Sequence, residues 1–455
     1  MGDRTGGQEN SGTFRVKKMK KKSIGIGLLG LGVVAGQVAR VLTDKADVLA
    51  EKVGCPLVLR KIKVLPQDLS RPQAKKMPAG LFTTDDDEFF NDPGIDIVIE
   101  AIGGERPAFD YLKRAITGGK HAVTSNKELI AKHGMELLAL AWKHGVGLQY
   151  EASVGGGIPL IAPFKHDLVA NKINAIYAII NGTTNYILTM MAREGMDFAA
   201  ALKRAQKLGY AEANPENDVE GIDAHYKLAI LASLAFQTQV RPQDIYREGI
   251  SRLNARDFRY ARELGFAIKL LAITKQSDDA IEARVHPVFI PQDSFLAKVD
   301  GVYNAVHVEG DLVGKVLFIG EGAGARPTSS AVVADVVSSA RKIVLGIGSL
   351  STWKAASGKV IKSMNEIETK YYIRLAAKDR PGVLAQIATV FGKNRISISS
   401  AIQPESDEKT RTAEIVIMTH PALEKAMQKA LRQLGKLEVV KEISNFIRVE
   451  DIEGG

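Results

Sequence analysis

The sequence is poor in the residues that build disulfides and metal clusters. Its 455 residues include one cysteine, Cys55, so an internal disulfide and a site made from several cysteines are both excluded. The eight histidines form no pair with metal-ligand spacing, and we expect His225 to face away from any pocket. No uninterrupted apolar run reaches the roughly 18–20 residues that a membrane span requires. We therefore expect a protein of a reducing, cytoplasmic compartment with no membrane partner.

Positive charge is concentrated near the amino terminus and is nearly balanced elsewhere. Residues 1–22 hold seven Lys or Arg against Asp3 and Glu9, which supplies +5 of the formal +9. This segment is polar and has neither the apolar core nor the cleavage site of a signal peptide. We expect a disordered basic tail and, because the remaining charge is small, no nucleic-acid partner.

Strand-like and helix-like segments alternate over residues 23–150. IGIGLLGLGVVAGQVARVL combines an apolar strand, a glycine turn and a helix, and further strand-like runs follow at 57–65, 95–103, 120–126 and 145–153. Alternation of this kind is typical of a parallel sheet covered by helices. The fold class is therefore α/β, and residues 23–150 are predicted to form a Rossmann-type, NAD(P)-binding domain.

The rest of the chain divides into two further units. Residues 151–347 mix strand-like runs with helices at 197–208 and 223–238, which is typical of an α+β domain. We expect this unit to bind substrate. Residues 348–370 are the best candidate for a linker. Residues 371–450 then follow the order strand, helix, strand, strand, helix, strand, which is that of a ferredoxin-like βαββαβ unit.

A glycine-rich loop between the first strand and the first helix predicts a dinucleotide site. Gly30 and Gly32 begin a G-x-G-x-x-A pattern that ends at Ala35. The first glycine permits a tight turn, and the second lets the backbone approach a pyrophosphate at the helix N-terminus. An ordinary strand–helix turn is the alternative, but the place of the loop after an apolar strand favours the nucleotide. The residues expected to contact the cofactor here are Leu29, Gly30, Gly32, Val33 and Val34.

The end of the second strand bears on the choice of cofactor. An enzyme that uses NAD usually has an acid there for the ribose 2′-hydroxyl, whereas cations suit the 2′-phosphate of NADP. The strand LVL is followed by Arg60 and Lys61, and no acid stands at that point. We therefore expect both cations to bind the cofactor and NADP to be preferred over NAD; a solvated strand end is the alternative.

One segment, residues 205–227, gathers acids around a lysine. Asp223 and Lys227 are four residues apart, so on a helix they share one face. An Asn-Pro turn is expected to bring Glu212 and Asp218 over the start of that helix. Three acids would hold a substrate ammonium group and keep a proton-transferring lysine in place. A solvated helix end is the alternative, but the apolar flanks predict partial burial, where unused charges are costly.

Three more segments are candidates because of their position. Lys127 follows a strand at its carboxyl end, where doubly wound sheets bind ligands, so it is either a nicotinamide or reacting-oxygen contact or a surface lysine. The glycine-rich turn 151–158 is either a bare loop or a site for a monovalent cation on carbonyl oxygens. Residues 181–185, NGTTN, suit either a substrate carboxylate or a helix N-cap.

These segments together resemble homoserine dehydrogenase. The signature of that family is met at Ala205, Gly209, Tyr210, Asn214, Pro215, Asp218, Val219, Gly221, Asp223 and Lys227. Further similar segments are GLLGLGVV, IDIVIEAIGG, AVTSNKELIA, YEASVGGGIPLI, IINGTTNYIL and GEGAGARPTSSAVVADV, and the resemblance covers about residues 23–340. Ala35 departs from the third glycine that most members have, and it is compatible with NADP-type loops.

The resemblance implies NAD(P)-dependent interconversion of L-homoserine and L-aspartate 4-semialdehyde, on the route to threonine and methionine. Lys227, or Lys127 in its place, would transfer the proton, and Asp223 would orient Lys227. The substrate would be bound by Glu212, Asp218, Tyr210, Thr183 and Gly182. The cofactor would also be contacted by Lys127 and Gly324. A sodium-type cation would be held by oxygens of Glu151, Val154, Gly156 and Ile158.

The carboxyl-terminal segment resembles an ACT domain through DRPGVLAQIA at 379–388. Such domains bind amino acids at paired interfaces, and the usual inhibitor in this family is threonine. The effector positions would be Asp379, Pro381, Gly382 and Asn394. A packing domain without a ligand is the alternative. The resemblance also implies a homodimer or a homotetramer.

Two rival assignments fit the residues less well. An ACT-bearing phosphoglycerate dehydrogenase would place its dinucleotide loop in mid-chain and use a His–acid pair. Here the loop begins at Gly30 and no such pair stands out. A non-catalytic amino-acid sensor is disfavoured because all four signature groups, Glu212, Asp218, Asp223 and Lys227, are intact.

Overall fold

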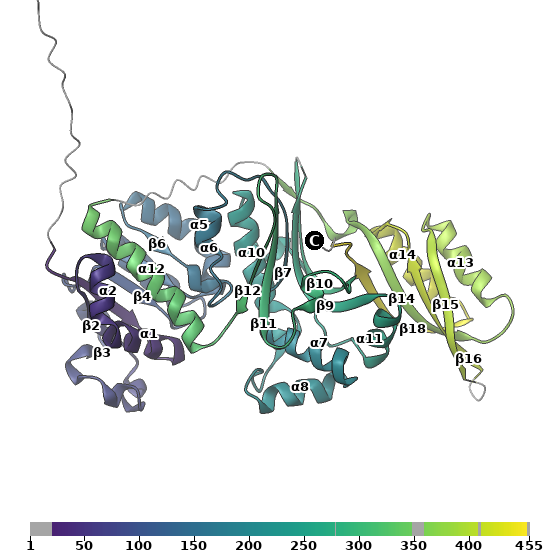
Figure 1. Ribbon diagram of the computed structural model, residues 1–455, viewed down its shortest axis with the longest axis horizontal. Helices are drawn as coiled ribbons and strands as arrows, with labels where there is room; N and C mark the ends of the chain where they lie inside the picture. The colour runs from purple at the N-terminus through teal and green to yellow at the C-terminus, as the bar shows by residue number, and fades with distance from the viewer. Residues whose placement is uncertain (1–20, 278, 348–358, 408–410, 453–455) are drawn as a thin grey trace, which may run out of the picture.

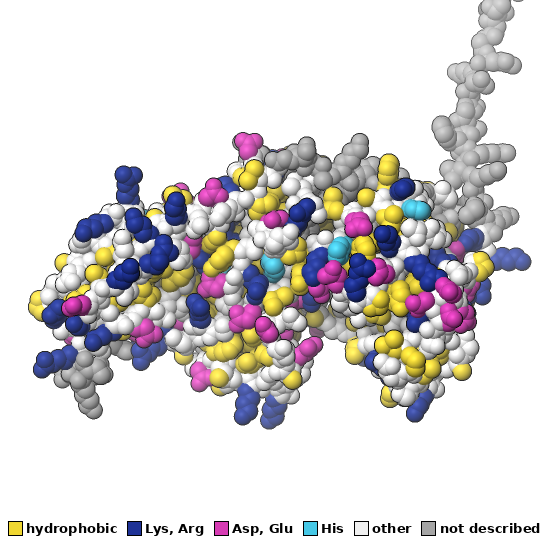
Figure 2. All heavy atoms as spheres, turned by 180° about the vertical axis from the view of Figure 1, so that it is seen from behind, with side chains coloured by type: hydrophobic (Ala, Val, Ile, Leu, Met, Phe, Trp, Pro, Cys, Tyr) yellow, Lys and Arg dark blue, Asp and Glu magenta, His cyan; other side chains and the backbone are white. Residues whose placement is uncertain are grey.

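The computed structural model describes residues 21–277, 279–347, 359–407 and 411–452. Most of the predicted basic tail and half of the predicted linker lie outside the described residues. Two β-sheets organise the described part, with helices packed on each (Figure 1). None of its helices is long and apolar enough to cross a membrane. On the face shown in Figure 2, Lys and Arg side chains are interspersed with Asp and Glu side chains.

The first sheet is parallel and has the strand order of dinucleotide-binding folds, β3-β2-β1-β4-β5-β6. β1 (Ile24–Leu29) is fully buried between β2 (Leu57–Lys63) and β4 (Ile97–Glu100), which explains its continuous apolar run. The other strands are β3 (Phe82–Thr83), β5 (His121–Thr124) and β6 (Leu148–Gln149). The helices are α1 (Val33–Asp44), α2 (Ala46–Val53), α3 (Asp86–Phe90), α4 (Ala108–Thr117) and α5 (Lys127–Lys143). The predicted Rossmann-type fold is confirmed.

Helix α12 (Ala325–Leu345) comes from a distant part of the chain and packs on this first sheet (Figure 1). Its Val332 and Val336 share one buried core with Ile26 and Val38. The predicted boundary at residue 150 placed this helix in the second unit, and the structure corrects that assignment. The sequence did not reveal the error because amphipathicity marks the buried face of a helix and not its partner.

The second sheet is antiparallel through the middle of the chain, in the order β12-β11-β7-β9-β10. Its strands are β7 (Ile173–Ile179), β9 (Phe266–Gln276), β10 (Ala280–Pro291), β11 (Tyr303–Gly310) and β12 (Gly314–Glu321), with the short β8 (Tyr246–Arg247) beside β10. The helices of this unit are α6 (Ile161–Lys165), α7 (Gly182–Glu194), α8 (Phe198–Lys207), α9 (Glu216–Val219), α10 (Ile222–Phe236) and α11 (Ala255–Glu263). α7, α10 and α11 share one core with a single face of the sheet. The α+β prediction is confirmed, although only β7 and β10 were expected as strands.

The carboxyl-terminal unit has the predicted βαββαβ order. It consists of β14 (Glu368–Lys378), α13 (Val383–Lys393), β15 (Ile398–Asp407), β16 (Thr412–Thr419), α14 (Glu424–Leu434) and β18 (Val440–Val449), with the short β13 (Val360–Ile361) and β17 (Ala422–Leu423). Both helices pack on one face of its sheet around a core that includes Ile373, Phe391 and Met427.

The two mixed units share one continuous sheet, which the sequence did not predict. The end of β18 runs parallel to β10, with Val288 beside Arg448 and Phe289 beside Val449. The path of strands therefore continues from β10 through β18 to β14, β16 and β15. Figure 1 shows the carboxyl-terminal unit extending from the second sheet, on the side away from the nucleotide-binding unit.

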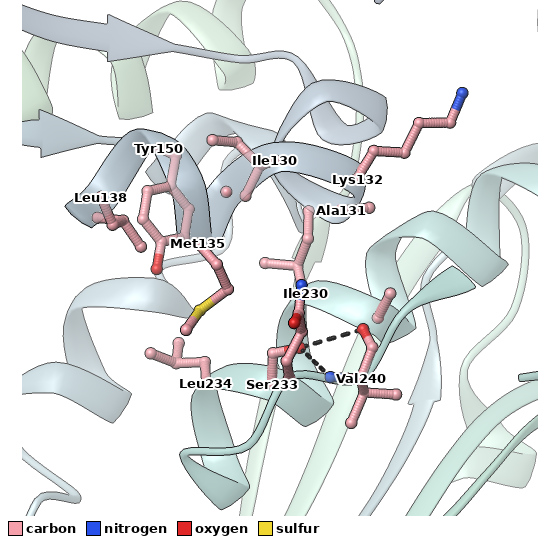
Figure 3. A pocket seen from close by; sticks show the side chains of 13 residues that line it. Ile130, Ala131, Lys132, Met135, Leu138, Tyr150, Ile230, Ser233, Leu234 and Val240 are labelled. Carbon is pink, nitrogen blue, oxygen red and sulfur yellow. Dashed lines mark hydrogen bonds between the residues drawn. The ribbon is translucent and has the colours of Figure 1, made fainter. Parts of the chain in front are cut away.

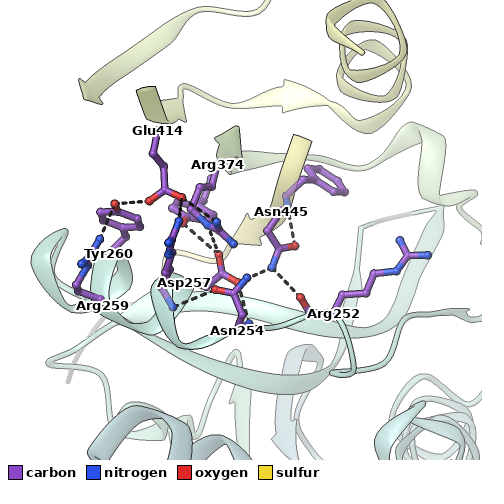
Figure 4. A network of polar contacts seen from close by, with 11 residues as sticks. Arg252, Asn254, Asp257, Arg259, Tyr260, Arg374, Glu414 and Asn445 are labelled. Atoms are coloured by element: carbon purple, nitrogen blue, oxygen red, sulfur yellow. Dashed lines mark hydrogen bonds and ion pairs between the residues drawn. The ribbon is translucent and has the colours of Figure 1, made fainter. Parts of the chain in front are cut away.

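Buried ion pairs hold the carboxyl-terminal unit against the second unit. Arg374 on β14 donates from Nε to Asp257 on α11 at 2.9 Å and from Nη1 to Glu414 on β16 at 3.0 Å (Figure 4). Asn445 on β18 donates to the other oxygen of Asp257 at 2.6 Å. Asp257 is fully buried, so its charge depends on these partners.

We expect Asp257→Ala to lower the free energy of unfolding by about 3–5 kcal/mol, because it leaves Arg374 buried with one partner fewer. Chemical denaturation followed by circular dichroism measures this. The matched control is Asp44→Ala, which breaks an exposed pair with Arg40 and is expected to cost less than about 1 kcal/mol. Equal losses in the two variants would contradict the assignment of Asp257 as a junction residue.

Candidate active site

One buried carboxylate, that of Asp223, bridges two lysines. Helix α10 begins after Gly221, whose φ of +74° suits glycine, and it carries Asp223 and Lys227 on successive turns. Asp223 Oδ2 accepts from Lys227 Nζ at 2.7 Å, and Oδ1 forms an ion pair with Lys127 Nζ. Asp223 and Lys227 are both less than 10% exposed. The predicted pairing of Asp223 with Lys227 on one helical face is therefore confirmed, and the solvated helix end is excluded.

Lys127 reaches this carboxylate because two helices from different units pack side by side. Asn126 caps α5 by accepting the N–H of Leu129 at 3.1 Å, which starts the helix directly after β5. Farther along, Ile130 and Met135 of α5 face Ile230 of α10 across a small apolar pocket (Figure 3). This contact brings the first turn of α5 to the first turn of α10.

Asn181 joins the two aspartates of the cluster. Its Nδ2 donates to Asp218 at 2.7 Å and to Asp223 at 2.9 Å, while its Oδ1 accepts the N–H of Thr184 and caps α7. The predicted alternative, a helix N-cap at NGTTN, is therefore present. The second role of Asn181 was missed, since nothing in its local sequence indicates a partner some 40 residues away.

The two lysines differ in their electrostatic setting. Burial lowers the pKa of Lys227 from its ordinary value, although Asp223 opposes the shift. Burial also acts on Lys127, but the charge of Asp223 and its hydrogen bond outweigh it, and the pKa of Lys127 is raised. Asp223 keeps a pKa well below its usual range in spite of burial, because both lysines face it. Burial raises the pKa of Asp218.

Lys227 has one N–H left for a ligand. Its Nζ donates to the carbonyl oxygen of Ile180 at 2.8 Å and to Asp223, and an ammonium group has three donors in all. Ile180 follows the last residue of β7, so the lysine is held both from the end of that strand and from its own helix. The arrangement fixes the amine and leaves one position on it open.

The other predicted substrate residues lie on the segments that lead into α7 and α9. Gly182 begins α7, where a Cβ atom would meet the carbonyl oxygen of Val302 at 2.6 Å. Thr183 donates to the carbonyl oxygen of Tyr210 at 2.6 Å. Glu212 is exposed, and within the described residues its carboxylate has no hydrogen-bond or ion-pair partner. Of the three acids expected around Lys227, Asp223 alone hydrogen bonds to it, Asp218 acts on it through its charge, and Glu212 lies apart on the exposed segment.

The glycine loop has the geometry that the sequence predicts. Gly30 has a φ of +90° and donates its N–H to the carbonyl oxygen of Lys63 at 2.8 Å. Gly32 is the N-cap of α1, and a Cβ atom there would meet nothing within 4 Å. An open space at a helix N-terminus suits a pyrophosphate. Leu29 is buried in β1, whereas Val33, the first residue of α1, is 72% exposed and Val34 packs on the core. Gly324, with a φ of +117°, caps α12.

Arg60 and Lys61 do not lie at the end of β2, which corrects a prediction. The strand continues to Lys63, and Lys61 forms an ion pair with Glu88. In the register of the two strands Arg60 lies between the partners of Ile26 and Gly27, and its guanidinium lies beside Gly94, before the start of β4. The charge therefore points toward the amino end of the strands and away from the glycine loop, which follows the carboxyl end of β1. The sequence showed a strand-like run over residues 57–65, which contains β2, but the end of its apolar part, LVL, was taken as the end that meets the cofactor.

Arg71 is a basic residue that contacts the glycine loop, and the sequence analysis did not predict this contact. Its Nη1 donates to the carbonyl oxygen of Leu31, between the two glycines, at 3.3 Å. Its Nη2 pairs with Asp68 at 2.7 Å, and about half of the side chain is exposed. Lys63, at the true end of β2, is buried and pairs with Asp86. The only sequence signal for Arg71 was its place after the second strand.

The carboxylate of Glu151 caps helix α6. Its two oxygens accept the N–H groups of Leu160, Ile161 and Ala162 at 2.6–2.8 Å. Both side-chain oxygens of Glu151 therefore accept hydrogen bonds from the start of α6, and the backbone carbonyls of the turn are the other candidates to hold a cation. Within the described residues, the carbonyl oxygens of Val154, Gly156 and Ile158 accept no hydrogen bond. These free carbonyls fit a monovalent cation better than a divalent one.

The predicted effector positions lie at opposite ends of α13. Asp379, Pro381 and Gly382 form the exposed turn before the helix, with Gly382 at a φ of +84°. Asn394 is the C-cap of the same helix and donates to Gln433 on α14 at 2.6 Å. Within one chain the structure does not bring Asn394 to the turn.

The chain matches known family models over most of its length. The model described as homoserine dehydrogenase, NAD binding domain, matches residues 30–151, the model described as homoserine dehydrogenase matches residues 159–337, and the ACT domain model matches residues 371–439. A homoserine dehydrogenase of Neisseria gonorrhoeae is 44% identical over 438 residues, which cover 95% of this chain and 99% of that protein.

Solved structures extend the likeness to three dimensions. The crystal structure of a homoserine dehydrogenase from Thiobacillus denitrificans has a TM-score of 0.86 at 41% identity and covers 95% of this chain and 99% of that one. A hyperthermophilic archaeal homoserine dehydrogenase in complex with NADPH has a TM-score of 0.60 at 26% identity and covers 70% of this chain and 98% of that one. Sequence and fold agree over nearly the whole length, so the chain belongs to the homoserine dehydrogenase family and ends in an ACT domain.

Proposed function

We propose that the cluster around Asp223 is the place where this chain interconverts L-homoserine and L-aspartate 4-semialdehyde. The observation that carries the proposal is Lys227, which is buried and fixed by Asp223 and Ile180, so that one position on its amine is open, an N–H when the amine is charged and a lone pair when it is neutral. In the oxidation, the hydroxyl oxygen of L-homoserine gives its proton to Lys227 Nζ. Bound nicotinamide supplies the acceptor for the hydride that leaves the same carbon.

Lys227 is the better proton acceptor of the two lysines. A group that accepts a proton must be neutral first, and burial lowers the pKa of Lys227 while Asp223 raises that of Lys127. Lys127 remains positively charged and lies where it can polarise the reacting oxygen or contact the nicotinamide. Asp223 orients both.

The substrate's amino-acid end is proposed to lie against α7 and Asp218. Asn181 donates to one oxygen of Asp218 and the Thr183 hydroxyl also lies close to this carboxylate, so we propose that the substrate's ammonium group binds the oxygen that Asn181 does not contact. The first N–H groups of α7, from Gly182 and Thr183, suit the carboxylate. Tyr210 and Glu212 belong to the segment that Thr183 holds, and we propose that they cover the substrate from that side.

We propose NADP as the preferred cofactor, and the residue that supports this choice is Arg71 in place of Arg60 and Lys61. A guanidinium at the glycine loop suits the 2′-phosphate of the adenosine ribose. The archaeal relative with NADPH supports the same choice. Residues 23–150 together with α12 form the proposed nucleotide-binding unit, and a sodium-type cation is proposed on the carbonyls of the 151–158 turn.

Regulation and assembly are proposed from the family and its ACT domain. L-Threonine is the proposed effector, at the turn formed by Asp379, Pro381 and Gly382 with Asn394 contributed at the paired interface. We propose a homodimer or homotetramer, a place on the route to threonine and methionine, and a cytoplasmic location in keeping with the single Cys55.

One assay tests the activity, the cofactor and the effector. Oxidation of L-homoserine is followed at 340 nm with NADP or NAD, each with and without L-threonine. We expect activity, a preference for NADP, and inhibition by L-threonine. No oxidation of L-homoserine would overturn the proposal, while insensitivity to L-threonine would overturn its regulatory part only.

We expect Lys227→Met to lower kcat at least about 100-fold, because the proton acceptor is removed from a site that still binds NADP. Steady-state kinetics and NADPH fluorescence titration measure the two effects. The matched comparison is Lys127→Met. This variant is expected to keep a larger part of the wild-type kcat than Lys227→Met does, and to have a higher KM than the wild type. The reverse order of the two kcat values would assign the role of proton acceptor to Lys127.

We expect Arg71→Ala to raise the KM for NADP about tenfold or more and to leave the KM for NAD nearly unchanged, because only NADP has the 2′-phosphate. Arg60→Ala is the control, since the guanidinium of this arginine lies beside Gly94 and points away from the glycine loop, and it should change neither value. If Arg60→Ala raised the KM for NADP more than Arg71→Ala does, the prediction made from the sequence, that Arg60 binds the cofactor, would stand.

A further inference from the structure

Glu100 ends β4, at the edge of the first sheet where the carboxyl ends of three strands meet. It lies beside Leu29 of β1 and Thr124 of β5, and its side chain is fully buried. Doubly wound sheets bind their ligands at this edge. Within the described residues no Lys or Arg forms an ion pair with Glu100, so its carboxylate is stabilised by hydrogen bonds alone.

One oxygen of this carboxylate shapes the loop that follows β4. Glu100 Oε1 accepts the N–H groups of Ile102 and Gly103 at 2.9 and 3.2 Å. The loop touches the glycine loop, since a Cβ atom on Gly30 would lie 2.7 Å from Ile102 Cγ2. In the part of the chain that the structure describes, the carbonyl oxygens of Ala101, Ile102 and Gly103 accept no hydrogen bond. The N–H groups therefore turn inward to Glu100, and the carbonyls are left for the donors of a ligand.

The other oxygen of Glu100 is connected to the start of α5. Oε2 accepts the hydroxyl proton of Thr124, and the oxygen of that hydroxyl accepts the N–H of Asn126 at 3.0 Å. Asn126 is the N-cap of α5 and donates from Nδ2 to the carbonyl oxygen of Gly104 at 2.6 Å. The next residue is Lys127. A chain of hydrogen bonds thus runs from Glu100 to the residue before a lysine of the candidate site, and Asn126 ties the same loop to α5.

The ionised form of Glu100 fits these partners. Burial raises the pKa of Glu100, and the hydrogen bonds from Thr124, Ile102 and Gly103 oppose that shift. All three partners are donors, and an ionised carboxylate accepts from each of them without donating. A glutamine in its place would keep the two N–H groups on its oxygen, but its NH2 group would face Thr124. The hydroxyl proton of Thr124 would then lose its acceptor.

We propose that Glu100 is a positioning residue that sets Lys127 and the loop 101–104 in one geometry at the nicotinamide end of the bound cofactor. It acts on Lys127 through Thr124 and Asn126, and on the loop through the N–H groups that it accepts. The effect on turnover rests on the proposed activity and on the proposed place of Lys127. The effect on cofactor binding rests on neither of them.

Kinetic coupling to Lys127 tests the first part. We expect Thr124→Val and Glu100→Gln each to lower kcat/KM for L-homoserine about tenfold, because a small displacement of a group at the reacting centre is costly. In the Lys127→Met chain the same substitutions should lower it less than about twofold, because the residue through which they act is gone. A purely structural role gives the same fold-loss in both chains. Equal losses, or single variants with the wild-type kcat/KM, would overturn this part.

The matched control is Thr83→Val. Thr83 is a buried threonine at the end of β3 that donates to Glu88 and accepts the N–H of Asp85 at 3.1 Å, so it makes the same pair of hydrogen bonds on another strand. Thr83→Val should lower the thermal unfolding temperature about as much as Thr124→Val does and leave kcat/KM for L-homoserine unchanged. A loss of kcat/KM equal to that of Thr124→Val would show that turnover follows stability, which contradicts positioning by Glu100.

NADPH binding tests the loop and requires no substrate. In fluorescence titration of the full chain, Glu100→Ala should bind NADPH at least about tenfold more weakly than the wild type, because two N–H groups lose their acceptor. Glu100→Gln keeps an oxygen for Ile102 and Gly103 and should recover most of the affinity. Thr124→Val leaves Oε1 in place and should change the Kd less than about threefold. Wild-type affinity in Glu100→Ala would overturn this part.

Thermal unfolding shows whether each variant is folded. If Glu100→Ala does not fold, Glu100→Asp, whose carboxylate is one CH2 group shorter, takes its place with the same expected loss of NADPH affinity. A wild-type chain that binds NADPH and does not oxidise L-homoserine would refute the proposed activity and leave the role of Glu100 at the loop standing.

Discussion

The carboxylate of Asp223, held between Lys127 and Lys227, is the interaction on which the candidate site depends. Three charges in a largely buried place are tolerated only while they remain paired, since an isolated buried charge costs several kcal/mol. The pairing requires α5 of the nucleotide-binding unit and α10 of the substrate unit to keep their first turns together. The apolar contact between these two helices therefore helps to position the amines of Lys127 and Lys227 relative to each other.

A similar principle governs the carboxyl-terminal unit. Arg374 and Arg448 are almost fully buried, and each is paired with carboxylates of both units. Such pairs are weak evidence for net stability, but they are demanding in geometry, because a lost partner leaves a buried charge. Together with the β10–β18 pairing they make the ACT domain a continuation of the catalytic sheet. A change in one unit can thus reach the other through a stiff connection.

The candidate site was predicted best where its residues are close in sequence. Asp223 and Lys227 form one helical face, and the glycines at 30 and 32 form one turn, so local periodicity was sufficient. Prediction was poorer where a contact spans the chain. Glu212 does not touch the cluster, Asn181 joins Asp218 to Asp223, and Arg71, not Arg60 or Lys61, contacts the glycine loop. The error at β2 arose because the end of the apolar stretch LVL was taken as the end of the strand, although the strand-like run continued to residue 65.

The sequence by itself determined the fold class, the βαββαβ order of the last unit, the nucleotide loop and the family. These follow from local spacing of apolar residues, glycines and charged groups, which the chain carries in any conformation. Only the tertiary structure decided that α12 returns to the first sheet, that β18 joins β10, and that Lys127 shares a carboxylate with Lys227. The reason is physical: a periodic pattern shows that a face must be buried, but the partner that buries it is chosen by the packing of the whole chain.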